Sequence, residues 1–273
     1  MSLTITLIQT DLVWENIDAN LFQIGEKINA ISVRTELIVL PELYSTGFTM
    51  NPEKMAETME GKAVTWMKRI ATTKRVILIG SIAIKENGNY FNRLIWMLPN
   101  GQFSYYDKRH LFAFSGEDNH YTAGNQRLIA QVKGWKINLQ ICYDLRFPVW
   151  ARQQTLEGEA EYDLLVYVAN WPEKRSHAWK SLLMARAIEN QCYVVGVNRI
   201  GNDGNGIYHS GDSTVINPLG DVIFTEKDNE AVFTITLKKE DLCAIRNQFP
   251  FLKDADDFLI RKKSRNDISI TDV

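Results

Sequence analysis

The sequence predicts an α/β protein built as a layered sandwich. Short apolar stretches typical of buried strands alternate with stretches of helical periodicity along most of the chain. No internal repeat, low-complexity linker or change of composition divides it. A length of 273 residues suits one large domain, because α/β folds of about this size commonly form a single unit. We therefore expect one domain over residues 1–273, with a flexible, charged tail from about residue 261.

Composition and charge narrow the class of protein. Hydrophobic residues make up 45% and charged residues 23%, the usage of a soluble globular chain. The 31 Lys and Arg balance 33 Asp and Glu without a basic block before the tail, so neither nucleic acid nor a membrane surface is an expected partner. No apolar run reaches the roughly 18 residues of a membrane span, and the N-terminus lacks the features of a signal peptide. Cys142, Cys192 and Cys243 are odd in number and far apart, which favours a cytoplasmic protein over a disulfide framework or a zinc site.

Periodicity places the elements of the first half. Apolar residues recur every three or four positions from Ile17 to Ile31, which predicts an amphipathic helix. Leu37–Leu40 is continuously apolar, as in a strand buried on both faces. The other elements predicted here are strands at Thr4–Gln9, Val76–Ile84, Tyr90–Leu98 and Gln102–Asp107, and a helix at Ala63–Thr73.

The second half begins with a long loop and then alternates again. Residues Ser115–Asn125 are polar and punctuated by glycine, and loops of this length in a compact domain are often functional. Strands are predicted at Lys136–Ile141, Leu164–Ala169, Tyr193–Asn198, Ser213–Asn217, Val222–Thr225 and Ala231–Thr236, and helices at Val149–Glu157, Ala178–Glu189 and Lys239–Asn247. Asn202–Gly206 is a turn whose glycine spacing does not fit a phosphate cradle.

Polar residues that follow buried strands are the candidates for chemistry. Glu42 follows Leu37–Leu40, and the carboxyl ends of parallel strands are where sites form in α/β sheets. Cys142 ends the strand Lys136–Ile141 and precedes a helix, whose N-terminal dipole favours a thiolate. Taken alone, each residue also fits a structural role: Glu42 fits an acid on the surface, and Cys142 fits a buried thiol. Cys192 and Cys243 are better explained as core packing.

The histidines do not support a cysteine–histidine site. His110, His120, His177 and His209 are scattered and belong to no cysteine-protease signature. A base for Cys142 would then be a carboxylate, with a lysine as the positive partner. Lys108, just after the strand Gln102–Asp107, is a candidate, although alone it also fits a solvated surface lysine.

Three motifs together resemble the nitrilase superfamily of carbon–nitrogen hydrolases. They are Pro41-Glu42, Asp107-Lys-Arg-His-Leu-Phe112 and Cys142-Tyr-Asp-Leu-Arg-Phe-Pro148, with 66 residues from Glu42 to Lys108 and 34 from Lys108 to Cys142. Two further segments, Ala185–Gln191 and Gly211–Pro218, extend the resemblance to roughly Leu3–Phe258. Within the superfamily, Tyr44–Phe48, Asn170–Pro172 and Val197–Gly201 are similar to the bacterial omega-amidases of the YafV type.

The resemblance implies a four-layer αββα sandwich and a metal-free, cofactor-free hydrolysis of amides. Cys142 would be the nucleophile that forms a thioester, and Glu42 the general base. Lys108 would stabilise the oxyanion together with the N–H of Tyr143 and lower the thiol pKa. Glu117 corresponds by position to the second glutamate of the family, with its neighbour Asp118 as the alternative.

The implied substrates are ω-amides of keto acids such as 2-oxoglutaramate, which carry a carboxylate remote from the scissile amide. Tyr143, Asn170, Trp171 and Arg175 are the expected substrate-binding residues. Among three arginines considered for the carboxylate, Arg146, Arg175 and Arg199, the segment Asn170–Arg175 is preferred. The resemblance also implies a homodimer, for which the apolar stretch Phe249–Leu252 is a plausible contact.

Other functions stay open at this point. The same residues would serve a hydrolase of nitriles, aliphatic amides or N-carbamoyl amines. A layered sandwich could also be a metal-dependent phosphoesterase, but the scattered histidines give no cluster of ligands. An inactive binding protein is disfavoured because Glu42, Lys108 and Cys142 are all present.

Overall fold

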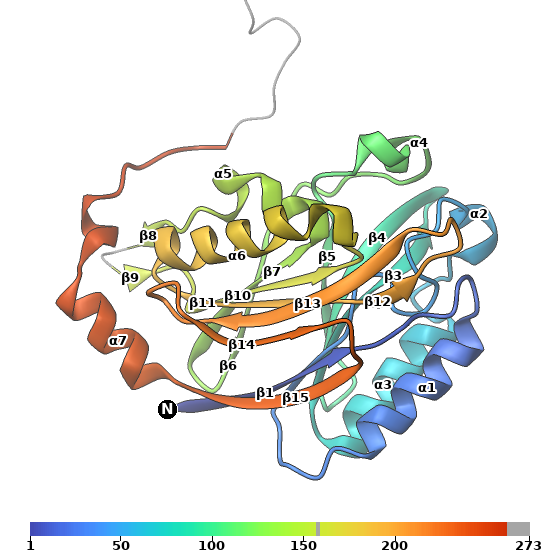
Figure 1. Ribbon diagram of the computed structural model, residues 1–273, viewed down its shortest axis with the longest axis horizontal. Coiled ribbons are helices and arrows are strands. Elements are labelled where there is room, and N and C mark those ends of the chain that lie inside the picture. Colours follow the sequence, from blue (N-terminus) through green and yellow to red (C-terminus); the bar gives the residue numbers. More distant parts are fainter. Residues whose placement is uncertain (157–158, 261–273) are drawn as a thin grey trace, which may run out of the picture.

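Two β-sheets pack face to face and helices cover their outer sides, as Figure 1 shows for the computed structural model, which describes residues 1–156 and 159–260. Helices α1 (Ile17–Asn29) and α3 (Lys62–Lys74) lie on the first sheet, and α6 (Ser176–Asn190) lies on the second. The expected αββα sandwich is confirmed.

The first sheet pairs the first strand of the described chain with its last strand. Its strands are, in spatial order, β15 (Ala231–Lys238), β1 (Ser2–Gln9), β2 (Leu37–Val39), β3 (Ile77–Glu86), β4 (Asn89–Met97) and β5 (Phe103–Asp107). The pairs β1–β2 and β2–β3 are parallel, whereas β3, β4 and β5 form an antiparallel meander. Strand β2 therefore ends in the middle of the sheet, where Glu42 follows it.

The second sheet has three parallel strands at its centre. Its strands are, in spatial order, β12 (Ile200–Asn202), β13 (Tyr208–Ile216), β11 (Tyr193–Asn198), β10 (Leu164–Ala169), β7 (Trp135–Ile141) and β6 (Leu128–Val132), with β14 (Val222–Lys227) beside β13. Strands β7, β10 and β11 run parallel, so their carboxyl ends meet at one edge. Cys142, Asn170 and Arg199 follow these three strands directly.

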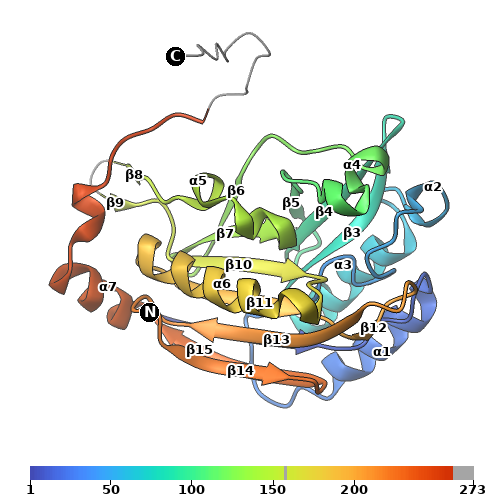
Figure 2. The same cartoon turned by 45° about the horizontal axis from the view of Figure 1, so that its top comes forward.

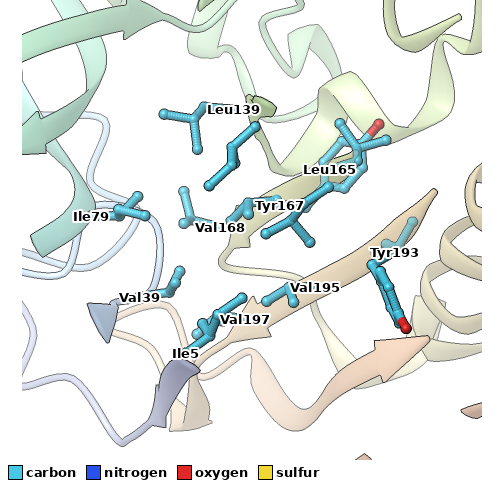
Figure 3. Close-up of a cluster of buried hydrophobic side chains, with 14 of the residues drawn as sticks. Ile5, Val39, Ile79, Leu139, Leu165, Tyr167, Val168, Tyr193, Val195 and Val197 are labelled. Atoms are coloured by element: carbon cyan, nitrogen blue, oxygen red, sulfur yellow. The ribbon is translucent and has the colours of Figure 1, made fainter. Parts of the chain in front are cut away.

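The interface between the sheets is the main apolar core. Figure 3 shows Ile5, Val39 and Ile79 of the first sheet next to side chains of the second, among them Val195 and Val197. A second cluster lies between the first sheet and its helices, where Leu21, Ile24 and Ile28 of α1 are buried as the periodicity predicts. The strands of both sheets are thus covered on two sides, which explains their continuous apolar runs.

Short helices connect the layers. They are α2 (Pro52–Met55), α4 (Glu117–His120), α5 (Pro148–Ala151) and the 3₁₀ helices η1 (Ala113–Ser115), η2 (Cys142–Arg146), η3 (Glu173–Arg175) and η4 (Phe251–Asp254). Helix α7 (Lys239–Gln248) begins beside the N-terminus, where the Lys239 N–H donates to the carbonyl oxygen of Met1 at 3.0 Å (Figure 2).

The helix predicted at Val149–Glu157 is wrong. Helix α5 ends at Ala151, and the chain then extends into β8 (Thr155–Leu156), which pairs with β9 (Glu159–Ala160). Gln153 causes the extension, because its N–H donates to Asn190 Oδ1 at 2.8 Å and its side-chain oxygen accepts from the Tyr162 N–H at 2.7 Å. These contacts replace helical hydrogen bonds. Residue 157 and the predicted tail from residue 261 lie outside the described residues.

Two smaller predictions also differ from the structure. Strand β6 was not expected, and α4 interrupts the predicted loop Ser115–Asn125. Cys192 is fully buried as expected for core packing, but Cys243 on α7 is exposed. The prediction of core packing is therefore wrong for Cys243.

Candidate active site

The predicted nucleophile, Cys142, lies at the turn between β7 and η2. Its backbone φ is +45°, a left-handed conformation that residues with a Cβ rarely adopt and that costs roughly 1 kcal/mol or more. The residue is 8% exposed and lines a cavity. The sharp turn therefore brings the sulfur to the wall of this cavity.

The carboxylate of Glu42 is fully buried and hydrogen-bonded through both oxygens. Its Oε1 accepts from Lys108 Nζ at 2.8 Å and from Asn92 Nδ2 at 2.8 Å, and its Oε2 accepts from the Asn170 N–H at 2.7 Å. The side-chain amide of Asn170 also donates to the carbonyl oxygen of Glu42. The end of β2 is thereby joined to the end of β10, so the site bridges the two sheets.

Lys108 follows β5 and sits between two carboxylates. Its Nζ donates to Glu42 and, at 3.0 Å, to each oxygen of Glu117, while its own side chain is fully buried. Burial alone would lower the pKa of Lys108, but Glu117 and Glu42 outweigh burial and raise the pKa above its ordinary value. Lys108 therefore carries a permanent positive charge inside the protein.

Glu117 is the second glutamate of the site, and the alternative Asp118 is not. Glu117 begins α4, is fully buried, and accepts a hydrogen bond from the Phe112 N–H at 2.6 Å in addition to those from Lys108. Asp118 is exposed. Burial raises the pKa of Glu117, Lys108 opposes that effect, and Glu42 adds to it.

The thiol of Cys142 is not activated in the resting site. Burial is the largest influence on its pKa and the Glu42 carboxylate is the next, and both raise it well above the ordinary value. Lys108 acts in the opposite direction without offsetting them. The expected lowering by Lys108 is therefore present but smaller than these two effects, so the net pKa is raised and the sulfur stays protonated until a base removes its proton.

A cavity of about 560 Å³ opens at the carboxyl ends of β7 and β10. All four predicted substrate-binding residues line it, together with Lys108 and Cys142: they are Tyr143, Asn170, Trp171 and Arg175. This volume suits a small-molecule ligand.

Two guanidinium groups face the cavity. Arg146 lies over the ring of Trp171, 5.0 Å from its centroid, and Arg175 lies over the ring of Phe112 at 5.1 Å. Within the part of the chain that the structure describes, neither guanidinium has an ion-pair partner. Burial and the neighbouring Arg146 lower the pKa of Arg175 while Cys142 raises it, so the pair would gain from a bound anion.

Arg199 does not belong to this cavity. Its fully buried side chain pairs with Asp11 and donates from Nε to the carbonyl oxygen of Ile200 at 2.8 Å. Its Nε and Nη2 already donate to protein oxygens and the side chain does not line the cavity, which removes it as an anchor for a substrate carboxylate.

Sequence reasoning missed several residues of the site. Asn92 on β4 donates to Glu42 and, at 3.4 Å, to Glu117 Oε1. The one sequence feature that could have identified Asn92 is the presence of a polar residue within a predicted apolar strand. Trp14 and His209 also line the cavity but belong to no motif that marks them, and Phe48 lines it at the end of the segment Tyr44–Phe48.

Two further observations concern residues 1–156 and 159–260. No three His, Cys, Asp or Glu side chains among them gather in a way that could hold a metal ion. None of the helices formed by these residues is both long and apolar enough to cross a membrane.

Comparison with protein families decides the classification. The family model of the carbon–nitrogen hydrolases matches residues 4–247, which include Glu42, Lys108, Glu117 and Cys142. The chain belongs to the carbon–nitrogen hydrolase family. The resemblance found in the motifs is confirmed, and this hydrolase carries its buried glutamates, lysine and cysteine at one site.

Individual relatives match this carbon–nitrogen hydrolase over nearly its whole length. It is 44% identical to the omega-amidase YafV of Escherichia coli over 94% of this chain and 98% of the relative. It is 32% identical to the 2-oxoglutaramate amidase of Bacillus subtilis over 93% and 98% of the two chains. A solved structure of a CN-hydrolase superfamily protein from Xanthomonas campestris superposes with a TM-score of 0.94 at 40% identity, covering 96% of this chain and 100% of the other.

Proposed function

We propose that this carbon–nitrogen hydrolase is an omega-amidase, which cleaves the terminal amide of keto acids such as 2-oxoglutaramate to a carboxylate and ammonia. The relatives named for omega-amidase and 2-oxoglutaramate amidase activity support this substrate class. The observation that carries the proposal is the cavity itself, which combines Cys142 and Lys108 with two guanidinium groups, of Arg146 and Arg175, that have no ion-pair partner among residues 1–156 and 159–260.

The first step forms a thioester. Glu42 takes the proton of the Cys142 thiol, which is needed because burial keeps the thiol pKa high. The sulfur then attacks the amide carbon. The ammonium of Lys108 and the N–H of Tyr143, in the first turn of η2 where N–H groups lack helical partners, stabilise the developing oxyanion.

The second step releases ammonia and then the product acid. Glu42 returns its proton to the leaving nitrogen, and afterwards removes a proton from the water that hydrolyses the thioester. Glu117 holds Lys108 in place through two hydrogen bonds of 3.0 Å. No metal or organic cofactor takes part in this scheme.

Arg175 anchors the remote carboxylate, and Arg146 assists it. A guanidinium binds a carboxylate through two parallel hydrogen bonds, and aromatic rings beneath both groups fix their planes. Both residues lie on segments that directly follow the ends of β7 and β10, beside Cys142. A substrate held at its carboxylate would therefore present the amide at its other end to the sulfur.

Ammonia release from a panel of substrates tests the proposal. The panel contains 2-oxoglutaramate, its decarboxylated analogue, neutral aliphatic amides, nitriles and N-carbamoyl amines. Loss of a desolvated bidentate pair costs about 2–4 kcal/mol, so kcat/KM for the analogue should fall tens to several hundred fold. Equal turnover of neutral amides or nitriles would contradict the omega-amidase assignment and favour another carbon–nitrogen substrate.

We also propose that the enzyme is a cytoplasmic homodimer. The free state of all three cysteines fits a reducing compartment. Phe251, in the apolar stretch Phe249–Leu252, is 63% exposed and leaves an aromatic surface for a second copy, although Leu252 is itself buried. Cell fractionation would check the location.

A further inference from the structure

Asp144 is a fully buried carboxylate two residues after the nucleophile. Four donors surround it. Its Oδ2 accepts from the Ile141 N–H at 3.0 Å and from the Tyr106 hydroxyl at 2.7 Å. Its Oδ1 accepts from the N–H of His110 at 2.9 Å and lies 2.8 Å from His110 Nδ1. None of the steps described above uses this carboxylate.

These four contacts join the two catalytic segments. Ile141 precedes Cys142, and its bond to Asp144 closes the turn that gives Cys142 its positive φ. Tyr106 and His110 lie two residues before and two residues after Lys108. One carboxylate therefore holds the backbone on both sides of Lys108 and the turn that carries Cys142.

The partners of Asp144 are themselves fixed. The Tyr106 oxygen accepts from Trp150 Nε1 at 3.0 Å and from the Arg109 N–H at 3.1 Å. The His110 ring stacks on Phe147 with centroids 3.8 Å apart. Trp150 and Phe147 follow η2, so the network connects the same two segments a second time.

We propose that Asp144 is a positioning residue that sets the place of the Cys142 sulfur relative to the Lys108 ammonium. The inference rests on the proposed roles of Cys142 and Lys108. A displacement of about 1 Å between reacting groups can cost on the order of a hundredfold in rate. Arg146 and Arg175, the proposed anchor of the substrate carboxylate, are not among these hydrogen-bond partners of Asp144. The affinity for the substrate should therefore be unchanged.

The test is the substitution Asp144→Asn, which keeps the size of the side chain. It leaves one side-chain oxygen that accepts hydrogen bonds in place of two. Some of the groups that donate to Asp144 then face the NH₂ group of the asparagine, which cannot accept a hydrogen bond. With the amide that the wild type hydrolyses fastest, kcat per active site should fall ten- to a hundredfold, with KM within about threefold. The rate at which iodoacetamide alkylates Cys142 should change as well, and this reaction needs no substrate.

Asp163→Asn is the matched control. Asp163 is also buried, at 3% exposed, and accepts from the Lys136 N–H, Lys239 Nζ and Arg246 Nη1, but it precedes β10 and lies at the opposite end of the strand from the cavity. A comparable fall in Tm with unchanged kcat is expected for this variant. Tyr106→Phe, which removes one donor to Asp144 and keeps the ring, should lower kcat by a smaller factor and serves if Asp144→Asn does not fold.

The outcomes separate the two proposals. If Asp144→Asn, or Tyr106→Phe in its place, lowers Tm but leaves kcat, KM and the alkylation rate at the wild-type values, Asp144 is purely structural and the inference is overturned. If the wild type fails to hydrolyse any amide of the panel, the proposed function fails, while the alkylation rates still decide whether Asp144 positions Cys142.

Discussion

At the residue scale, three buried charged groups form one hydrogen-bonded cluster at the candidate active site. One ammonium, on Lys108, lies between the carboxylates of Glu42 and Glu117. Buried charges cost several kcal/mol each unless they are paired, so each of these groups is retained through its partners. Burial raises the pKa of Cys142 and of Glu117, and the Glu42 carboxylate adds to the effect on both groups. The Cys142 thiol therefore keeps its proton until a base removes it.

Replacing the nucleophile should abolish hydrolysis and leave the fold intact. We expect Cys142→Ala to have no measurable ammonia release and a circular dichroism spectrum like that of the wild type. Iodoacetamide labelling with peptide mapping provides the second measurement, performed in a Cys243→Ser background because Cys243 is exposed. Activity lost in step with labelling of Cys192 would refute the assignment of Cys142.

Glu117 and Asp118 form a matched pair of neighbours for a second test. Glu117→Gln removes a charged acceptor from Lys108, which should loosen the ammonium and lower kcat by about tenfold or more. Asp118→Asn changes an exposed carboxylate and should leave kcat within twofold. Steady-state ammonia release measures both variants. Equal kcat values for the two variants would place Glu117 outside the mechanism.

Because of the buried His209, the free energy of unfolding should fall at acidic pH. Burial, with Arg199 nearby, lowers the pKa of this histidine to about 4, whereas an unfolded histidine titrates near 6.5. Below about pH 6.5 the unfolded chain binds a proton that the folded chain does not, so the stability present above this pH is lost as the pH falls towards 4. Between pH 7 and pH 5 the wild type should lose about 2 kcal/mol more free energy of unfolding than His209→Asn does.

Urea unfolding at the two pH values measures this difference. His177→Asn is the control, since His177 is exposed. If the pH dependence of His209→Asn equals that of the wild type, the folded protein accepts the proton at this position and the predicted effect is absent.

At the scale of elements, the contact between β11 and α6 depends on a glycine. A Cβ at Gly196 would lie 2.6 Å from Leu183 Cδ1 and 2.8 Å from Trp179 Cζ2, too close without movement of the helix. Gly196→Ala should therefore lower the free energy of unfolding by roughly 1–3 kcal/mol. Gly25→Ala in α1 is the control with opposite sign, because its Cβ would meet Trp66 at an ordinary 3.8 Å and alanine favours a helix. Thermal unfolding would show whether the two shifts in Tm differ in sign.

Most predicted elements lie at their expected positions, including the buried strand β10 and the largely exposed strand β14. Strands β7, β10 and β11 and helices α1 and α6 have their expected positions, since burial imposes a local period on the residues. The predicted helix at Val149–Glu157 failed because Gln153 bonds to Asn190 and Tyr162, which are 37 and 9 residues away. Such a contact has no local signature.

At the scale of the whole molecule, light scattering should give about twice the 31.3 kDa mass of one chain at micromolar concentration. The exposed aromatic surface at Phe251 is the proposed contact, so Phe251→Asp should shift the mass towards that of one chain. Phe22→Asp, on the 71% exposed Phe22 of α1, should not. A wild type with the mass of a single chain would refute the homodimer.

The sequence alone predicted a layered α/β sandwich and the resemblance to the family, and it marked Glu42, Lys108 and Cys142 as the candidate site residues. All of these follow from short-range patterns, namely apolar runs that end in a polar residue and motifs of a few positions. The tertiary structure decided what depends on distance between separate segments. It placed Asn92 against Glu42, bonded Asp144 to residues that flank Lys108 and Cys142, and put Glu117 rather than Asp118 beside Lys108. It paired Arg199 with Asp11 and left Arg146 and Arg175 to line the cavity. It also determined the net pKa shift of Cys142: Lys108 lowers this pKa as expected, but burial and the Glu42 carboxylate, which act only once the chain has folded around the sulfur, raise it by more.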